Sequence, residues 1–444
     1  MNKKVHFVIM LTLLLIGMFT FAFNIHPAEA SGTIYIRPDG SVEGTARIQR
    51  NGDIYTFTDN LYDSIVVERD NIAVDGASYT LQGAWSGTGI DLTGRSNVTI
   101  KNLQIQSFEY GIWLRIGSNN NISGNNIRLN EYMGIIFLGG SSNNIISGNN
   151  ITANNNEGIF LSGASNNVIF GNNIAYNELP GIYLYHSQGN NVSGNEMANN
   201  GDGIWLGHSS NNIIFENDIT ANNGDGIMFY GSLDNVISRN KVEFNQQGIN
   251  LRDSSNNNII HHNNFVHNLQ QVSSVASTNL WDDGFPSGGN YWSDYEERYP
   301  NATEIDGSGI WDTPYVIDEN NQDNYPLAIP IGTVPATIDI FPETLNIYSL
   351  FGRFVKAYIE LPEGYDVSDI DISTVKLNEE VQAELHPTKI GDYDTDGMPD
   401  LMVKFDRTNV VRSILRSGRN TLVITGNLVE KPFMGRDTIR VIGQ

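Results

Sequence analysis

Short apolar segments of three or four residues, separated by glycine, asparagine and serine, recur along the middle of the chain. In GDGIWLGHSSNNIIFENDITANNGDGIMFYGSLDN (residues 201–235) the first three lie at 204–206, 213–215 and 218–220. These segments show no 3.6-residue period and are too short for amphipathic helices. The pattern therefore predicts three short β-strands per repeat, joined by tight turns.

A Gly-Ile dipeptide marks each repeat and returns every 22 to 24 residues. A period of this length is typical of solenoids, in which one repeat forms one turn. Three strands per turn predict a parallel β-helix, with turns about 4.8 Å apart. The glycines are Gly89, Gly111, Gly134, Gly158, Gly181, Gly203, Gly226 and Gly248.

Two asparagine columns keep step with the glycines. Asparagine tolerates the left-handed backbone of tight corners, and its amide can both donate and accept between stacked turns. We therefore expect both columns to form ladders inside the solenoid. The first column is Asn97, Asn120, Asn144, Asn167, Asn190, Asn212, Asn235 and Asn258. The second is Asn102, Asn125, Asn149, Asn172, Asn195, Asn217, Asn240 and Asn263.

An apolar column accompanies them three residues after each glycine and is predicted to fill the core. Its members are Leu92, Leu114, Phe137, Leu161, Leu184, Leu206, Phe229 and Leu251. A second apolar column stands two residues after the second set of asparagines, and only its first copy, Gln104, is polar.

The Gly-Ile-x-Leu and Asn-Asn-x-Ile turns resemble the NosD-type β-helix family, described as periplasmic copper-binding, within a broader class of carbohydrate-binding and sugar-hydrolase β-helices. The segment NLWDDGFPSGGNYWSDY, which begins at Asn279, resembles the one that follows such helices in prokaryotic surface proteins. The resemblance covers about residues 65–327 and implies a right-handed helix. It identifies the fold well and an activity poorly.

The ends of the chain differ from the repeat. Residues 1–30 combine Lys3-Lys4, an apolar run and Ala28-Glu29-Ala30, which predicts a secretory signal peptide, with an uncleaved anchor as the alternative. Residues 31–70 are strand-like without the repeat and are expected to cap the helix, which occupies 71–278.

After the repeat, residues 279–332 are rich in aromatic residues and predict a C-terminal cap and linker. Residues 333–444 contain short strand candidates at the spacing of a β-sandwich and resemble immunoglobulin-like modules of surface proteins. The predicted fold class is all-β: a right-handed parallel β-helix solenoid followed by a small β-sandwich.

Charge and cysteine content narrow the function. The chain has no cysteine, so disulfides are excluded. Its formal net charge of −24 argues against nucleic acid and anionic membranes as partners, and no membrane insertion is expected after signal removal. The acidity suits divalent cations, although it also serves simply to keep an exported protein soluble.

The segment DYDTDGMPD predicts a structural Ca²⁺ site. Its oxygen ligands follow the spacing of an EF-hand-type loop, and glycine supplies the turn. Val403 stands where the bidentate glutamate is expected, and Asp406 is the possible substitute; an acidic solvated turn is the alternative. The predicted ligands are Asp392, Asp394, Asp396, Met398 through its carbonyl and Asp400. A second, less complete loop would use Glu304, Asp306, Ser308 and Asp312.

Large side chains occupy the position between two core residues on the first strand of each turn, where they must point outward. A row of exposed aromatics is suited to sugar rings, or to coverage by another protein copy or by the terminal segments. The predicted carbohydrate-binding residues are Trp113, Phe160, Tyr183 and Trp205.

Catalytic residues are not predicted, although Asp202, Asp225 and His208 are candidates if the protein is a polysaccharide lyase, hydrolase or epimerase. Glu157, Asp202 and Asp225 precede repeat glycines, but Asp-Gly is also a common corner pair.

Adjacent His261 and His262 are expected on opposite faces of a strand, so that one of them at most could join His267 in a copper site.

These observations favour an exported, calcium-stabilised protein, secreted or on the cell surface, that binds polysaccharide or surface glycan without catalysis. Another surface protein or a second copy is the alternative partner. Polysaccharide-active enzyme and accessory protein in periplasmic copper maturation are the alternative functions.

Overall fold

The computed structural model describes residues 32–349, 352–413, 417–429 and 431–443, so the predicted signal peptide lies outside the described residues. The chain divides into two compact units. The first runs to residue 233 without 214–216, and the second contains 214–216 and 234–444. No helix in the described ranges is long and apolar enough to cross a membrane.

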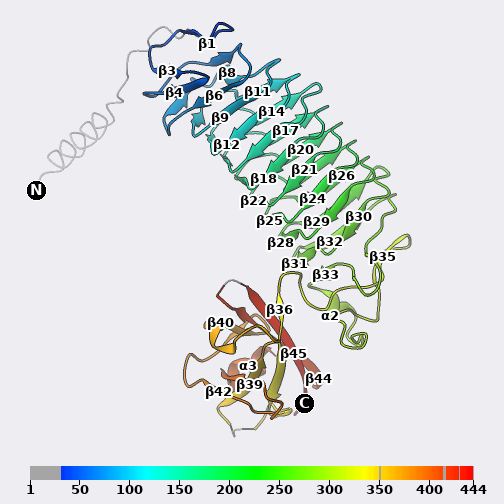
Figure 1. Ribbon diagram of the computed structural model, residues 1–444. Helices are drawn as coiled ribbons and strands as arrows, with labels where there is room; N and C mark the ends of the chain where they lie inside the picture. The colour runs from blue at the N-terminus through cyan, green and yellow to red at the C-terminus, as the bar shows by residue number, and fades with distance from the viewer. Residues whose placement is uncertain (1–31, 350–351, 414–416, 430, 444) are drawn as a thin grey trace, which may run out of the picture. The chain divides into compact units, whose positions relative to one another are not determined.

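The first unit is a solenoid of three sheets in which successive turns pair in parallel, apart from the antiparallel pairs β1–β2 and β3–β4 at its N-terminal end (Figure 1). In the first sheet the order is β2 (Val42–Glu43), β1 (Ile34–Ile36), β5 (Ile65–Val67), β8 (Thr88–Asp91), β11 (Tyr110–Arg115), β14 (Ile135–Leu138), β17 (Ile159–Ser162), β20 (Ile182–Tyr185), β23 (Ile204–Gly207) and β26 (Asp225–Tyr230).

The other two sheets of this unit follow the same progression. One contains β7 (Thr80–Gln82), β10 (Gln104–Gln106), β13 (Asn126–Arg128), β16 (Asn150–Thr152), β19 (Asn173–Ala175), β22 (Glu196–Ala198) and β25 (Asp218–Thr220). The other contains β3 (Ile48–Asn51), β4 (Ile54–Phe57), β6 (Ile72–Asp75), β9 (Val98–Lys101), β12 (Asn121–Ser123), β15 (Ile145–Ser147), β18 (Val168–Phe170) and β21 (Asn191–Ser193).

The second unit begins with further turns of the same kind and ends in a β-sandwich. Its solenoid strands are β24 (Ile213–Phe215), β27 (Val236–Ser238) and β30 (Ile259–His261); β28 (Lys241–Glu243), β31 (Asn264–Val266) and β33 (Tyr291–Trp292); and β29 (Gln247–Arg252) and β32 (Gln270–Ser274). The cap contains α2 (Tyr295–Arg298), β34 (Tyr315–Asp318) and β35 (Asn321–Asp323).

The predicted apolar column fills the solenoid core. From Leu92 to Leu251 every member is fully buried, and paired strands hold equivalent residues opposite one another, as Leu161 lies opposite Leu184. Glycine precedes this column because a Cβ on Gly158 would lie 2.7 Å from the backbone oxygen of Gly181 on the next turn. The repeat glycines are therefore required where consecutive turns approach most closely.

The predicted asparagine ladders are present in the interior. The backbone N–H and the side-chain amide of Asn144 both donate to Oδ1 of Asn167, each over 3.0 Å, and the Asn144 amide also donates to the Gly117 carbonyl. Each buried amide thus satisfies polar groups of its own and neighbouring turns, which a buried polar group needs in order not to destabilise the fold.

The first copies of the two columns were predicted wrongly. Asn97 and Asn102 are exposed residues with φ of 56° and 55°, and they bond outward to Asn71 and Asp75. The ladders instead begin one residue later in the repeat, where Val98 and Leu103 occupy the asparagine positions and donate their N–H groups to Asn120 and Asn125. This shift also explains Gln104: the inward residue of that turn is Ile105.

A third asparagine ladder runs through the solenoid and was not predicted. Within it Asn154 donates from its backbone N–H and its amide to Oδ1 of Asn177, over 3.1 and 2.9 Å. Its spacing from the repeat glycine changes between three and four residues, which hides the column in the sequence. The ladder consists of Asn130, Asn154, Asn177, Asn200, Asn222, Asn245 and Asn268.

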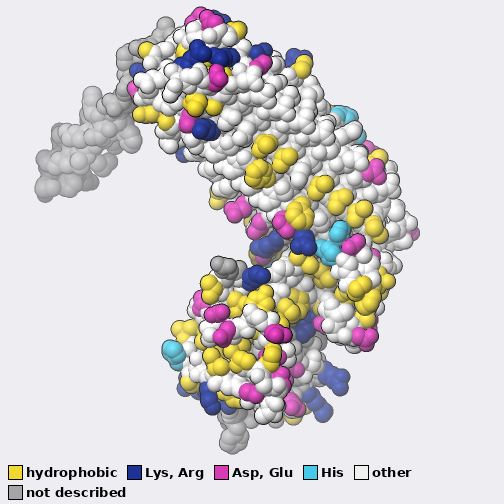
Figure 2. Space-filling view, viewed as in Figure 1, with side chains coloured by type: hydrophobic (Ala, Val, Ile, Leu, Met, Phe, Trp, Pro, Cys, Tyr) yellow, Lys and Arg dark blue, Asp and Glu magenta, His cyan; other side chains and the backbone are white. Residues whose placement is uncertain are grey.

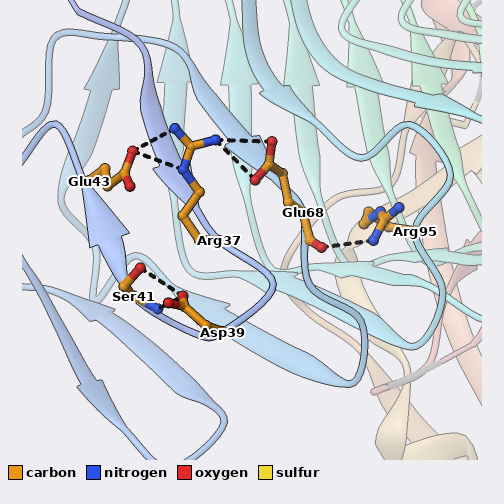
Figure 3. A network of polar contacts seen from close by, with 6 residues as sticks. All are labelled: Arg37, Asp39, Ser41, Glu43, Glu68 and Arg95. Carbon is orange, nitrogen blue, oxygen red and sulfur yellow. Dashed lines mark hydrogen bonds and ion pairs between the residues drawn. The ribbon is translucent and has the colours of Figure 1, made fainter.

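An ionic network closes the N-terminal end of the stack (Figure 3). Strand β1 pairs in parallel with β5, and Arg37 after β1 contacts the carboxylates of Glu43 and Glu68. Arg95 donates to the Glu68 backbone oxygen over 2.9 Å. Charged side chains at this open edge disfavour pairing with another chain.

The C-terminal cap packs aromatic rings on the last turn. Trp292 stacks on Phe265 with centroids 4.6 Å apart and on Tyr315 at 4.2 Å. Asp323 is buried beneath them and accepts hydrogen bonds from the Asn290 N–H, the Trp292 indole and the Tyr325 N–H. Burial raises the pKa of Asp323 to about 7.

The β-sandwich packs two sheets around a hydrophobic core that includes Phe405 and Phe433. One sheet contains β36 (Val334–Pro335), β38 (Thr344–Asn346), β40 (Asp371–Leu377), β41 (Val381–Gln382), β44 (Gly418–Asn427) and β45 (Pro432–Ile442). The other contains β37 (Thr337–Phe341), β39 (Phe354–Glu360), β42 (Lys389–Gly391) and β43 (Asp400–Asp406). The short helices are η1 (Val367–Asp369) and α3 (Arg407–Ser413).

Candidate functional site

The outward column of the first sheet brings three aromatic rings together on consecutive turns. Phe160 lies opposite Tyr183, and Tyr183 opposite Trp205. The ring centroids are 5.2 Å apart in the first pair and 5.1 Å in the second, where the rings are stacked. All three side chains are partly exposed. They form one surface, which we call the ring stack.

Trp113 belongs to a separate group. Its neighbour in the column is Ile136, which is only 4% exposed and lies between Trp113 and Phe160 in the strand order. Trp113 packs edge-on against Tyr110, which also contacts Tyr132. The four predicted sugar-binding residues are therefore divided between two groups.

Glu157 borders the ring stack at the start of its strands. It immediately precedes the repeat glycine, is 7% exposed, and its Oε2 is buried without a hydrogen-bond partner. Burial raises the pKa of its carboxyl group. The pKa of Tyr183 is also raised, first by burial and then by Tyr185 and Glu157, which places the phenol near this acid.

Asp202 and Asp225 lie together on consecutive turns, whereas His208 does not join them. The Asp225 N–H donates to Oδ1 of Asp202 over 2.7 Å. Burial raises the pKa of Asp202, and the nearby Asp225 carboxylate adds to this effect. His208 follows the opposite end of β23, where it stacks on His186 with centroids 5.1 Å apart. The three candidate catalytic residues therefore do not form one site.

Charged side chains are unevenly distributed over the visible surface (Figure 2). Figure 2 shows that the visible face of the solenoid consists mainly of polar, uncharged side chains and backbone, whereas charged groups gather toward its N-terminal end and over the C-terminal part. An uncharged face offers neutral hydrogen-bonding groups to a ligand.

The acidic segment of the sandwich gathers carboxylates. Ligand atoms of Asp392, Asp394 and Asp400 lie within 4.8 Å of one another, and Asp394 and Asp396 form a similar group with Glu360. Glu360 lies directly opposite Asp400 in the β39–β43 pair, and its place beside the acidic segment could not be predicted because it is distant along the chain. Burial, followed by the neighbouring aspartates, raises the pKa of both Asp400 and Glu360.

Two other predicted participants lie elsewhere. Val403 is a core residue of β43. Asp406, the possible substitute for the missing glutamate, ends the same strand and accepts hydrogen bonds from the Thr408 and Asn409 N–H groups at the start of α3.

The second predicted loop is not assembled around one point. Asp312 accepts hydrogen bonds from the Thr303 backbone and hydroxyl and from the Thr313 hydroxyl, which lower the pKa of its carboxyl group. Among the described residues, Glu304, Asp306 and Asp312 do not converge as the carboxylates of the sandwich do.

His261 and His262 do not lie on opposite faces, which corrects the expectation from sequence. His261 ends β30, and His262 has a φ of 56°, so that the chain turns into a corner and the alternation of an extended strand no longer applies. The two Nδ1 atoms are 3.0 Å apart. His267 lies elsewhere and contacts Glu379.

Family models cover most of the solenoid. Residues 178–297 match the family described as "Periplasmic copper-binding protein (NosD)", and residues 48–195 match "Right handed beta helix region". The solenoid is a right-handed β-helix of the NosD type. No curated protein sequence matches the chain.

Several solved structures are similar to parts of this chain at low identity. The periplasmic alginate epimerase AlgG is 17% identical with a TM-score of 0.46, over 56% of this chain and 82% of that one. An alginate lyase from Paenibacillus sp. is 17% identical with a TM-score of 0.36, over 52% and 90%. The A-module of an Azotobacter vinelandii mannuronan C-5 epimerase is 14% identical with a TM-score of 0.35, over 59% and 85%.

Proposed function

We propose that this NosD-type protein is exported and binds polysaccharide on the outer face of its first sheet, without catalysing a reaction. The observation that carries the proposal is the ring stack of Phe160, Tyr183 and Trp205 on three consecutive turns. Large aromatic side chains on an outer face need a ligand or a partner to cover them. Successive turns present such rings at the strand spacing of about 4.8 Å, so an extended chain of sugars can lie along them.

Polar groups beside the rings favour a sugar over an apolar ligand. The Tyr183 phenol, whose pKa is raised by burial, can donate and accept hydrogen bonds. Asp202, whose pKa is raised in the same way, lies at the start of the Trp205 strand. A few polar groups placed around aromatic walls are the usual composition of a small-molecule site.

Export and a structural Ca²⁺ ion are two further parts of the proposal. The signal-like sequence at 1–30 and the periplasmic description of the matching family support export. The carboxylates of Asp392, Asp394 and Asp400, with Glu360 beside them, support a structural Ca²⁺ in the sandwich, because Ca²⁺ takes several oxygen ligands.

The binding test uses retention on a panel of immobilised polysaccharides, including uronate and neutral glucans. The variant Y183A/W205A is expected to weaken retention at least about ten-fold, since each aromatic contact is worth roughly 1 kcal/mol. Y176A is the matched control: Tyr176 is 65% exposed at a corner where Ala153 and Ala221 stand in other turns. Equal retention by wild type and Y183A/W205A, or absence of retention on every polysaccharide, contradicts the proposal.

A polysaccharide-active enzyme is the second candidate, and the observation that favours it is the buried Glu157 carboxyl with its raised pKa. A carboxylic acid that stays protonated can act as a general acid. Mass spectrometry of the retained polysaccharide is expected to show no shortened, unsaturated or epimerised product. Product formation that disappears in E157Q would establish the enzyme instead.

A further inference from the structure

The last turns of the solenoid differ from earlier ones at one corner. The corner that ends β12, β15 and β21 carries Ser-Gly, at residues 123–124, 147–148 and 193–194. At β30 the same two positions are His261 and His262, and His261 lies opposite Ser238 of the preceding turn. The backbone is unchanged, because Gly194 has a φ of 59° and His262 one of 56°. The backbone of this corner therefore does not account for the presence of the two histidines.

Hydrogen bonding fixes which nitrogen of His262 is available. Its Nε2 lies 2.9 Å from the backbone oxygen of Ser287. A carbonyl only accepts, so Nε2 carries the hydrogen and Nδ1 of the neutral ring keeps its lone pair. Metal-binding histidines commonly donate their other N–H to a carbonyl in this way. The lone pair of Nδ1 points toward His261, whose own Nδ1 is 3.0 Å away.

The cap loop brings a carboxylate to the same point. A carboxylate oxygen of Asp283 and one ring nitrogen of each histidine all lie within 4.8 Å of one another. The Ser287 hydroxyl donates to Oδ2 of Asp283 over 2.8 Å, and the His262 N–H donates to the Gly289 oxygen over 2.7 Å. The loop is thus anchored to the histidine corner, and the three groups come from segments whose positions are fixed by hydrogen bonds.

We propose that His261, His262 and Asp283 bind a divalent first-row transition ion of the class that prefers imidazole, Cu²⁺, Ni²⁺ or Zn²⁺. Imidazole and carboxylate together suit these ions, and metal–nitrogen bonds of about 2.0–2.1 Å place two ligand nitrogens on neighbouring coordination positions at the observed separation. His261 and His262 are partly exposed and Asp283 is exposed, so an ion can enter and keep solvent as a further ligand.

The charged residues next to the two histidines, Asp282 and Arg239, have other partners and do not block the binding of a cation. Asp282 is nearby, but its Oδ2 accepts hydrogen bonds from Asn324, and it is not needed as a ligand. Arg239 is the adjacent cation, and it forms an ion pair with Glu216 at 3.9 Å. The simpler function for the two rings is a hydrogen bond between their Nδ1 atoms, which the experiment must distinguish from metal binding.

The test titrates Cu²⁺ alone, and then Zn²⁺ alone, into the full chain by calorimetry. The variant H261S/H262G introduces the Ser-Gly found at this corner after β12, β15 and β21 and is therefore expected to preserve the corner. The control H186G/H208G removes another pair of neighbouring histidines, which are stacked, from a corner where Gly139, Gly163 and Gly231 stand in other turns. D283N removes the carboxylate charge.

The wild type is expected to bind one ion more than H261S/H262G does, and D283N to bind that ion at least about ten-fold more weakly. The electron paramagnetic resonance spectrum of bound Cu²⁺ is expected to show two nitrogen ligands, which H186G/H208G retains. The proposal would be overturned if wild type and H261S/H262G bound the ion with equal stoichiometry and affinity. Loss of the ion in H186G/H208G alone would also overturn it. In either case the two rings would be joined by a hydrogen bond only. Circular dichroism confirms that each variant is folded.

Discussion

The solenoid and the C-terminal β-sandwich bury polar groups in opposite ways. The solenoid interior contains three ladders of asparagines, each joined to the turns before and after it. Among the described residues of the sandwich, Asp400 is the buried polar side chain, and it stands within the acidic cluster. The rest of the sandwich core is hydrophobic.

This difference indicates whether the buried polar groups of each region need a ligand or an ion to stabilise them. A ladder amide is satisfied by its neighbours, so the solenoid needs no ligand to complete its hydrogen bonds. Asp400 instead lies beside other carboxylates, whose mutual repulsion is relieved only by protons or by a cation. We therefore expect the solenoid to respond to mutation of its interior and the sandwich to respond to ions.

The largest expected effect is loss of a ladder residue. Asn195 donates to Ile169, Ser193 and Asn217 and accepts from Asn172, so N195A leaves several buried groups unpaired. We expect the free energy of unfolding to fall by about 3–5 kcal/mol. Chemical denaturation measures it.

The control for N195A is N173A. Asn173 is an exposed residue that bonds to Asn150 along the outer surface, and its loss is expected to cost about 0.5 kcal/mol or less. Equal losses in the two variants would show that the inner ladders do not carry the stability of the solenoid.

Calcium is expected to stabilise the sandwich. At a concentration one hundred times its dissociation constant, Ca²⁺ would raise the free energy of unfolding of this region by about 2.7 kcal/mol. Calorimetric melting with calcium and with chelator measures the shift, which D394N/D400N should remove. D312N is the control for the second acidic segment, and a wild-type profile that calcium leaves unchanged would rule out the site.

The cap is expected to lose stability as pH rises. Because the folded pKa of Asp323, about 7, lies above its ordinary value of 3.8, protonation favours the folded state. This contribution is complete below the ordinary value and is lost as pH rises toward 7, at up to about 1.4 kcal/mol per pH unit. Urea denaturation across that range should show the slope in wild type and not in D323N; an identical slope would assign it to other groups.

The smallest expected effect is that of replacing Asn97, which lies at an exposed corner beside the first ladder. N97A is expected to change the free energy of unfolding by no more than about 0.5 kcal/mol, because Asn97 is exposed and outside the ladder. N120A should cost several times more, since the Asn120 side chain receives the Val98 N–H and donates to Arg95 and Asn144. Thermal melting of both variants decides whether Asn120 is the first asparagine of the ladder.

Sequence predicted the features that repeat at a constant interval. The glycine column, the apolar column and two asparagine ladders are all present, because stacking requires the same residue at the same point of each turn. The third ladder does not keep a constant distance from the repeat glycines, because the loop between Asn200 and Gly203 is one residue shorter than that between Asn177 and Gly181. It could therefore not be predicted from the repeat. Asn97 and Asn102 were misplaced because asparagine also suits the left-handed corner beside the ladder.

The candidate sites were less predictable because they depend on contacts between distant segments. Glu360 reaches the acidic loop through strand pairing, and Asp283 reaches the histidines through the cap. His261 and His262 were assigned to opposite faces by a rule that holds for extended backbone, which His262 does not have. Spacing alone carries no information of this kind.

The most direct test of the central claim is hydrogen–deuterium exchange of the full chain with and without a polysaccharide that it retains. We predict slower exchange at β17, β20 and β23, which carry Phe160, Tyr183 and Trp205, and unchanged exchange in the β-sandwich. Protection confined to the sandwich, or protection of the solenoid that persists in Y183A/W205A, would contradict the assignment of the ring stack as the binding surface.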